Sequence, residues 1–257
     1  MSASPKFPKH PSHWTEKALT AMDGNISLRV YYNHTKFDSP TIEARMLYVI
    51  HGQAEQSDRN EHFANYLQDQ VDVVACVDLP GHGRSQGVRG HIEKFDDYSH
   101  AALSGFEAAL HWVSSHKSKV TAHWFGHSLG GEITLRTLLK TQDLPLKSVF
   151  VSAPLIDLVM PVPKLKKIFG ELIEPVLGSL KLNNELNPAM VSHDPAVVAE
   201  YSNNPLNHKY VTPRFFVNMI KDMQLLRESK GPFHYNLMML IPLADPIVSW
   251  QASMKFF

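Results

Sequence analysis

Cysteine, excess charge of one sign and long apolar runs are all scarce in this 257-residue sequence. Cys76 is the single cysteine, so neither an intramolecular disulfide nor a cysteine-based zinc site can form. The 25 Lys and Arg residues balance 25 Asp and Glu residues, which removes the electrostatic basis for binding nucleic acid through a basic surface. No run approaches the ~18 apolar residues of a membrane span, and the amino terminus lacks the apolar segment of a signal peptide. We therefore expect a cytoplasmic protein.

What the sequence contains is an alternation of short apolar runs with longer segments of helical spacing, a pattern typical of a parallel sheet with crossover helices. We predict strands at Ile26–Tyr32, Arg45–Ile50, Val71–Val77, Val120–Phe125, Ser148–Ser152 and Leu237–Leu243, and helices at Asp58–Gln70, Phe95–Ser114 and Leu129–Lys140. The expected fold class is therefore α/β. With 44% hydrophobic residues, the chain is expected to form one domain over residues 1–257.

Residues 154–232 lack the strand pattern and are rich in Pro, Asn and Lys, so we predict a mostly helical insertion there. Apolar residues within it fall at three- and four-residue steps and form one face of a helix. They are Leu165, Ile168, Phe169, Leu172, Ile173, Val176, Leu177 and Leu180. We expect this stripe to pack on the body of the protein rather than to be exposed as a membrane anchor. If the insertion is a lid over an apolar pocket, the stripe could both pack on the body and contact a membrane.

The pentapeptide Gly126-His127-Ser128-Leu129-Gly130 matches G-x-S-x-G and lies between a predicted strand and a predicted helix. This is the context of a nucleophile elbow, in which a sharp turn lifts the serine hydroxyl out of the sheet. The N-terminus of the following helix favours the negative charge of a tetrahedral intermediate. A turn that only joins strand to helix is the simpler alternative, but the strand context and the additional Gly131 favour catalysis by Ser128.

The loop that ends another apolar run, Val49-Ile50-His51-Gly52-Gln53, supplies a candidate oxyanion donor. The N–H groups of Gln53 and Leu129 would form the hole, and we expect His51 to brace the loop by hydrogen bonding. The 15 histidines are scattered and do not meet the spacings of metal sites, so no metal is expected.

Several segments carry a family resemblance: HGQAEQS (51–57), DLPGHGRSQG (78–87) followed by HIEKFDDY (91–98), GHSLGG (126–131), SAP (152–154) and LADPIV (243–248). With these segments in this order, the chain from about Tyr48 onward resembles α/β hydrolases of the monoacylglycerol lipase, lysophospholipase and serine aminopeptidase S33-like group. The resemblance implies an eight-stranded, mostly parallel sheet and a helical cap inserted after the sixth strand. It also implies a Ser-Asp-His triad that hydrolyses lipid esters, with no cofactor.

In this resemblance the triad acid falls on Asp245, just beyond the apolar run Leu237–Leu243. A carboxylate there can face Ser128 and would orient and stabilise an imidazolium. An ordinary Asp-Pro turn is the simpler alternative for Asp245. Asp157 and Asp222 are weaker candidates for the acid.

The triad histidine has no counterpart after Asp245. In α/β hydrolases it follows the acid by a helix, a strand and loops, roughly 26 residues in all, whereas 12 residues follow Asp245 and none is His. His51, His82 and His127 are poor substitutes, and without a base Ser128 would be a weak nucleophile. The carboxyl-terminal strand and helix are thus expected to be missing, which leaves 237–243 as an edge strand with unpaired backbone groups.

We therefore expect a serine ester hydrolase that acts on lysophospholipid or monoacylglycerol through an acyl-enzyme on Ser128, in a truncated form of doubtful activity. A catalytically inactive relative that binds lipid or protein is the alternative, and short-chain esterase or aminopeptidase activity stays open within the group. Leu165, Phe169 and Ile173 are the candidate substrate-binding residues. The expected partners are a small-molecule lipid ester and, transiently, a membrane surface contacted through the cap, with no nucleic acid.

Overall fold

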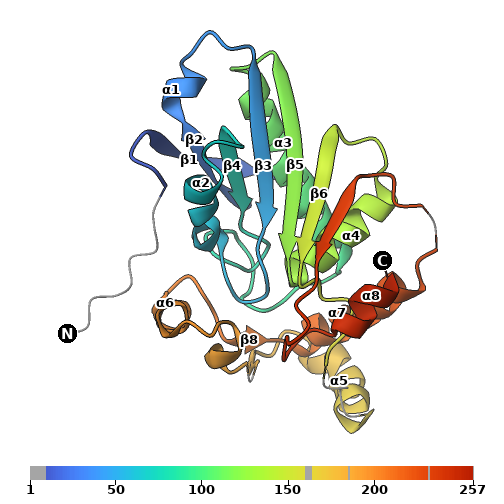
Figure 1. Ribbon diagram of the computed structural model, residues 1–257. Coiled ribbons are helices and arrows are strands. Elements are labelled where there is room, and N and C mark those ends of the chain that lie inside the picture. Colours follow the sequence, from blue (N-terminus) through green and yellow to red (C-terminus); the bar gives the residue numbers. More distant parts are fainter. Residues whose placement is uncertain (1–9, 160–163, 185, 231, 257) are drawn as a thin grey trace.

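A mixed β-sheet forms the centre of the computed structural model, which describes residues 10–159, 164–184, 186–230 and 232–256 (Figure 1). Within these residues the sheet has seven strands in the order β1-β2-β4-β3-β5-β6-β9. They are β1 (Trp14–Ala21), β2 (Ile26–Asn33), β3 (Glu43–Ile50), β4 (Val73–Val77), β5 (Lys119–His127), β6 (Leu146–Ser152) and β9 (Leu237–Leu240). Strands β1, β2 and β4 pair antiparallel, and every pair from β4 through β3, β5 and β6 to β9 is parallel. The predicted α/β class with a mostly parallel sheet is confirmed.

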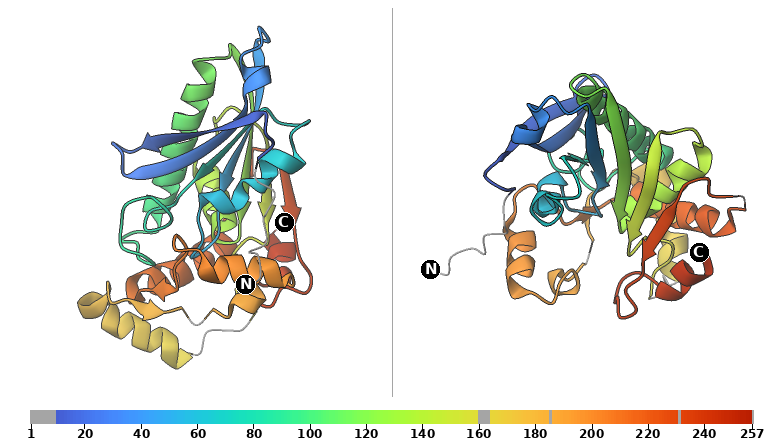
Figure 2. Two further views of the ribbon diagram at one scale, coloured as in Figure 1. Left: turned by 90° about the vertical axis from the view of Figure 1, so that its left-hand side faces the viewer. Right: turned by 45° about the horizontal axis from the view of Figure 1, so that its top comes forward.

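Helices cover both faces of the sheet. The long helices α3 (Asp96–Ser114) and α4 (Leu129–Lys140) lie against one face, and the short α2 (His62–Tyr66) lies against the other (Figure 2). The 3-10 turn η1 (Ser57–Asn60) precedes α2, α1 (His34–Phe37) connects β2 to β3, and α8 (Trp250–Phe256) follows β9. Because both faces are covered, the central strands are buried on both sides, and all five residues of β4 are buried.

Most predicted elements are present, with three differences. The predicted helix Asp58–Gln70 is wrong in extent, since the Leu67 carbonyl accepts the N–H groups of Gln70 and Val71 in a turn that ends the helical segment. The last predicted strand stops at Leu240 rather than Leu243. Strand β1 was not predicted, because its interior residues are mostly exposed and alternate poorly between apolar and polar types.

The insertion between β6 and β9 is the predicted helical cap. It contains α5 (Lys164–Leu177), η2 (Pro188–Met190), α6 (Pro195–Asn203), α7 (Pro213–Glu228) and a small antiparallel ladder of β7 (Leu182–Asn183) and β8 (Tyr210–Val211). In Figure 1 these elements lie beyond the arrowheads of the parallel strands. The cap therefore covers the carboxyl-terminal edge of the sheet, where ligand sites of open α/β sheets form.

Most residues of the apolar stripe whose side chains are described do not pack on the body of the protein, so for them that expectation was wrong. Ile168, Leu172 and Val176 are 61%, 75% and 84% exposed, and Leu177 and Leu180 are also exposed. The helix contacts α7, and the contact runs past Gly170, where a Cβ would lie 3.4 Å from the Phe216 ring. The contact with α7 leaves Ile168, Leu172 and Val176 exposed.

Strand β9 lies at the edge of the sheet within the described part of the chain. It pairs with β6 on one side, and two apolar side chains on its surface, Met238 and Leu240, are about half exposed. This agrees with the edge position predicted for 237–243. No helix among the described residues combines the length and apolar content needed to cross a bilayer.

Candidate active site

Ser128 sits in a strained turn between β5 and α4. Its φ and ψ are 52° and −116°, a conformation that costs a residue with a Cβ roughly 1–3 kcal/mol. Four backbone hydrogen bonds hold it there: its N–H donates to Ser152 O (2.9 Å), and its carbonyl accepts the N–H groups of Gly131 (2.9 Å), Glu132 (3.1 Å) and Leu155 (3.0 Å). The surrounding structure thus imposes the geometry expected of a nucleophile elbow, and the Ser128 side chain is half-exposed.

The first turn of α4 packs tightly against the end of β3. A Cβ at Gly130 would lie 2.4 Å from Ile50 O and 2.5 Å from His51 O, so only glycine allows this approach. As a result the N-terminus of α4, with the N–H of Leu129, lies beside the loop that begins at His51. The first N–H groups of a helix lack intrahelical acceptors, so this end is suited to an anion.

The loop after β3 is joined to the loop after β4. His51 Nδ1 donates to Gly52 O (2.7 Å), and Leu79 N–H donates to His51 Nε2 (3.1 Å). Asp78 accepts the N–H of Ser57 (2.7 Å) and that of Arg84 (2.9 Å). Both nitrogens of His51 are therefore hydrogen-bonded, Nδ1 within its own loop and Nε2 to the loop after β4, so His51 braces the loop as expected from the sequence.

Gln53, the second expected oxyanion donor, lies half-buried on the same loop. Its side-chain amide lies 3.3 Å from His82 Nε2, which places the loop beside His82 beneath the cap. Burial, with the charges of His51 and His208 added, holds the pKa of His82 well below its ordinary value. The imidazole of His82 is thus neutral and structural near neutral pH.

Glu55 and Arg59 are site residues that the sequence reasoning did not single out. A Cβ at Gly52 would lie 2.5 Å from Glu55 Oε1 and 3.2 Å from Ser128 Cβ, so both side chains lie close to Gly52. Glu55 accepts the N–H of Gly52 (2.7 Å) and that of Arg59 Nε (2.6 Å). Burial raises the pKa of Glu55, but Arg59, with His127, His51 and the Gly52 N–H, outweighs it, so the pKa is lowered overall. An ionised carboxylate therefore lies next to Ser128.

Arg59 also connects this loop to the cap. Its Nη1 donates to Glu200 (2.8 Å), and its guanidinium lies 5.0 Å from the centre of the Tyr201 ring, both on α6. His208 N–H donates to Ala54 O (3.1 Å). A Glu and an Arg four residues apart were a usable signal in the sequence. Glu200 lies 141 residues from Arg59, and no local pattern predicted their pairing.

Asp245 follows β9 at the carboxyl edge of the sheet, with β6 lying between β9 and β5, the strand that leads to Ser128. Its Oδ1 accepts the N–H groups of Ile247 (2.8 Å) and Val248 (3.0 Å), which fix the carboxylate on its loop. The loop is anchored to residues 157–159 through an isolated bridge between Leu158 and Val248. The two alternative acids are paired elsewhere, Asp157 with Arg227 (3.3 Å) and Asp222 with Arg136 (2.8 Å).

The candidate substrate-binding residues of α5 are only partly described. Ile173 is half-buried. The side chains of Leu165 and Phe169 lie outside the described residues.

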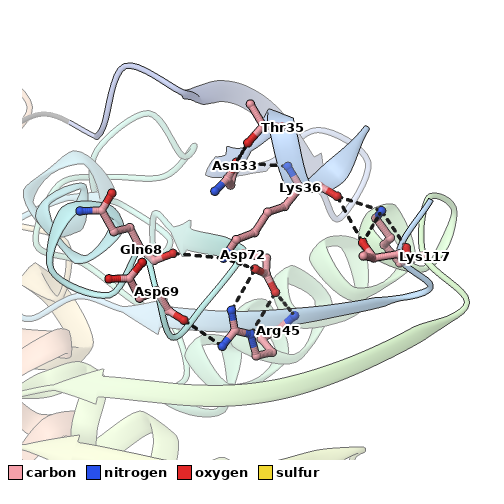
Figure 3. Close-up of polar contacts among 9 residues, drawn as sticks. Asn33, Thr35, Lys36, Arg45, Gln68, Asp69, Asp72 and Lys117 are labelled. Carbon is pink, nitrogen blue, oxygen red and sulfur yellow. Dashed lines mark hydrogen bonds and ion pairs between the residues drawn. The ribbon is translucent and has the colours of Figure 1, made fainter. Parts of the chain in front are cut away.

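Two further cavities are distant from this site. One, of about 540 Å³, lies at the opposite edge of the sheet, where strands begin, and is lined by Lys36, Arg45, Asp72 and Lys117 among others (Figure 3). Asp72 forms ion pairs there with Arg45 (3.1 Å) and Lys36 (3.1 Å). The other, of about 530 Å³, lies between the end of α4 and β9.

Within the described ranges, no three His, Cys, Asp or Glu side chains are grouped so that they could hold a metal ion.

Comparison with known proteins gives matches over most of the chain. The family model described as "Serine aminopeptidase, S33" matches residues 42–257. An uncharacterized abhydrolase domain-containing protein of Dictyostelium discoideum is 29% identical over 93% of this chain, which spans 24% of that protein. Phospholipase YtpA of Bacillus subtilis is 22% identical over 70% of this chain and 67% of its own length. A soluble variant of monoglyceride lipase from Saccharomyces cerevisiae, solved with a substrate analog, shares the fold with a TM-score of 0.75, at 17% identity over 99% of this chain and 85% of that one.

Proposed function

The chain belongs to the serine aminopeptidase S33 family of α/β hydrolases, and from this membership we propose that it is a serine hydrolase of lipid esters, with monoacylglycerol or lysophospholipid as substrate. The observation that carries the proposal is Ser128, held at a φ of 52° between β5 and α4 beside the loop of Gln53. Relatives named as a phospholipase and a monoglyceride lipase support the substrate class.

In the proposed reaction, Ser128 Oγ attacks the ester carbonyl carbon as a base removes its proton, and the alcohol leaves with a proton. Water then hydrolyses the acyl-enzyme and frees the fatty acid. The N–H groups of Leu129 and Gln53 stabilise the oxyanion, a contribution of about 3–4 kcal/mol per donor in a comparable enzyme. Asp245 is the acid that would orient the base, a histidine.

The two ends of such a substrate match the two sides of the site. Glu55 lies beside Gly52 close to Ser128 and is linked through Arg59 to Tyr201 of the cap, and we propose that these polar groups face a hydroxyl-bearing head group. The cap supplies apolar residues for the acyl chain, and within it Leu165, Phe169 and Ile173 are proposed to contact the chain. The exposed apolar side chains of α5 are proposed to touch the membrane surface from which the lipid is taken.

The serine is tested with a fluorophosphonate probe followed by peptide mapping. We expect labelling at Ser128 and none in Ser128→Ala, and hydrolysis of long-chain monoacylglycerol or lysophospholipid to exceed that of a short-chain ester. A wild-type protein that folds but leaves Ser128 unlabelled would contradict the proposal.

Membrane contact is tested separately by flotation with neutral phospholipid vesicles. Leu172→Glu should bind the vesicles more weakly than wild type. Lys221→Glu, at an exposed site on α7, should bind them as wild type does.

A second candidate is a catalytically inactive relative that keeps the site to bind lipid. The observation that favours it is the engagement of the nearby histidines: His51 and His82 both have their ring nitrogens in other contacts, and in the described part of the chain no histidine is hydrogen-bonded to Ser128. Stoichiometric binding of a fluorescent fatty acyl ester without turnover and without probe labelling would favour this candidate over the hydrolase.

A further inference from the structure

Glu132 is a buried carboxyl group one helical turn after Ser128. Its side chain is fully buried, and neither carboxyl oxygen has a hydrogen-bond partner among the described residues. Its backbone N–H donates to the Ser128 carbonyl (3.1 Å), so it belongs to the first turn of α4. An ionised carboxylate in such a place would pay a large desolvation cost without compensation.

The groups around Glu132 come from three helices. Asp222 of α7 is buried, pairs with Arg136 of α4 at 2.8 Å, and has its second oxygen without a partner in the described structure. Tyr98 of α3 is fully buried with its hydroxyl also unpartnered there. Arg227 of α7 is the other cation that acts on Glu132, but it donates to Ile156 O (2.7 Å) and pairs with Asp157. The sheet beneath α4 presents the indole of Trp124, bonded to Thr134.

Charge counting in this cluster leaves one carboxyl without a cation. Arg136 is committed to Asp222 and also lies 3.6 Å from Asp96 of α3, which Lys140 binds as well. Burial and, second, the charge of Asp222 raise the pKa of Glu132 well above its ordinary value, and Arg136 and Arg227 offset this only in part. Glu132 is therefore a neutral carboxylic acid over a range of pH in which exposed glutamates are ionised.

The neutral state of Glu132 matters for the proposed reaction because Glu132 lies in the first turn of α4, next to the proposed oxyanion donor Leu129. The inference that follows from this rests on the proposed hydrolase mechanism. We infer that Glu132 is a positioning residue that, while it carries its proton, keeps the N-terminal turn of α4 free of negative charge and so leaves the Leu129 N–H able to stabilise the oxyanion. On ionisation the same carboxyl opposes the charge that develops on the substrate.

The expected size of the effect follows from Coulomb's law. The carboxyl group and the Leu129 N–H belong to the same turn of α4. An ionised Glu132 and an oxyanion held at that N–H would therefore lie roughly 7 Å apart. At an effective dielectric constant of about 20, a unit charge at that distance slows the acylation of Ser128 on the order of 50-fold.

The experiment measures the second-order rate of fluorophosphonate labelling at Ser128 from pH 6 to pH 10. Wild type is compared with Glu132→Gln, with Glu132→Leu in case the buried amide folds poorly, and with the control Glu107→Gln at an exposed site on α3. We expect wild type and the control to lose up to about 50-fold in rate relative to both Glu132 variants as pH rises. Parallel profiles of wild type and the Glu132 variants would overturn the inference.

Thermal melting over pH 5–10 provides a readout that does not depend on the reaction. A group whose pKa is raised in the folded state contributes stability below its unfolded pKa and loses it as pH rises through the folded value. The melting temperature of wild type should therefore fall relative to Glu132→Gln with increasing pH, and a constant difference would refute the neutral state of Glu132. If Ser128 is unlabelled in every variant at every pH, the proposed hydrolase fails, and the melting profiles alone decide the protonation of Glu132.

Discussion

Lys117 is a buried cation whose removal should destabilise the protein without affecting the candidate active site. It is 4% exposed and lies between α3 and β5, at the sheet edge opposite Ser128. Its ammonium donates to the carbonyl oxygens of Ser39 (2.8 Å), Thr41 (2.9 Å) and Lys36 (3.2 Å). Figure 3 shows the bond between Lys117 and Lys36. These bonds hold the segment between α1 and β3 on the end of α3.

The substitution Lys117→Met keeps most of the apolar stem and removes the donor. A hydrogen bond to a charged group contributes about 1.5–3 kcal/mol, and a carbonyl left buried without a partner adds its desolvation cost. Since Thr41 is exposed and Ser39 half-exposed, water can replace part of the loss. We therefore expect a decrease of about 2–4 kcal/mol in the free energy of unfolding, measured by urea denaturation, and a fall in melting temperature of roughly 5–12 °C.

Lys119→Met serves as the matched control. Its side chain is 64% exposed, and it forms a surface ion pair with Glu43 at 3.1 Å, so the loss should stay below about 1 kcal/mol. Probe labelling of Ser128 should be unchanged in both variants. The reasoning is refuted if Lys117→Met lies within about 0.5 kcal/mol of the control, and a changed labelling rate would show that the cavity near Lys117 is coupled to the site.

Three further predictions concern the elbow and the charges at the start of the sheet. Ser128→Gly should raise the free energy of unfolding by about 1 kcal/mol, because glycine adopts the positive φ without strain, whereas Ser128→Ala should not; equilibrium denaturation of both variants checks this. Gly130→Ala should lower it by 3 kcal/mol or more, since the new Cβ would lie 2.4 Å from the Ile50 carbonyl oxygen; a stable variant in the same assay would contradict the packing described. Burial raises the pKa of Asp72, but its bonds with Arg45 and Lys36 outweigh that and lower it overall, so Asp72 contributes stability above its unfolded pKa that is lost as pH falls through the folded value. Asp72→Asn should accordingly cost about 1–3 kcal/mol at pH 7 and less at pH 3, and a cost that stays constant with pH, as followed by urea denaturation, would argue against this role.

The predictable part of the fold is the part that local sequence pattern determines. Short apolar runs between helical segments identified every strand of the parallel sheet, and α4 was predicted with its observed ends at Leu129 and Lys140. The position of the turn at Ser128 was predictable from the strand pattern before it and the glycines around it, whereas Ser152 and Leu155, which help to hold its conformation, lie outside that motif. The order of the motifs sufficed to recognise the family.

The sequence did not reveal which groups cover or pair with one another across the chain. The apolar stripe of α5 was identifiable, but its exposure depends on what lies opposite, and α7 covers only one strip of it. Glu55 and Arg59 gain their positions from a loop closed against the cap, where Arg59 binds Glu200, 141 residues away in the sequence.

Glu132 shows most clearly the difference between what the sequence predicts and what the tertiary structure decides. A glutamate in the first turn of a helix is, by sequence, an ordinary favourable residue at a helix N-terminus. Its full burial, its unpartnered oxygens and its proximity to Asp222 arise only when α3 and α7 pack over α4. Sequence pattern determined where backbone turns and apolar faces occur, because these depend on residues a few positions apart; tertiary packing decided which charges are desolvated, because desolvation depends on every segment that closes around a group.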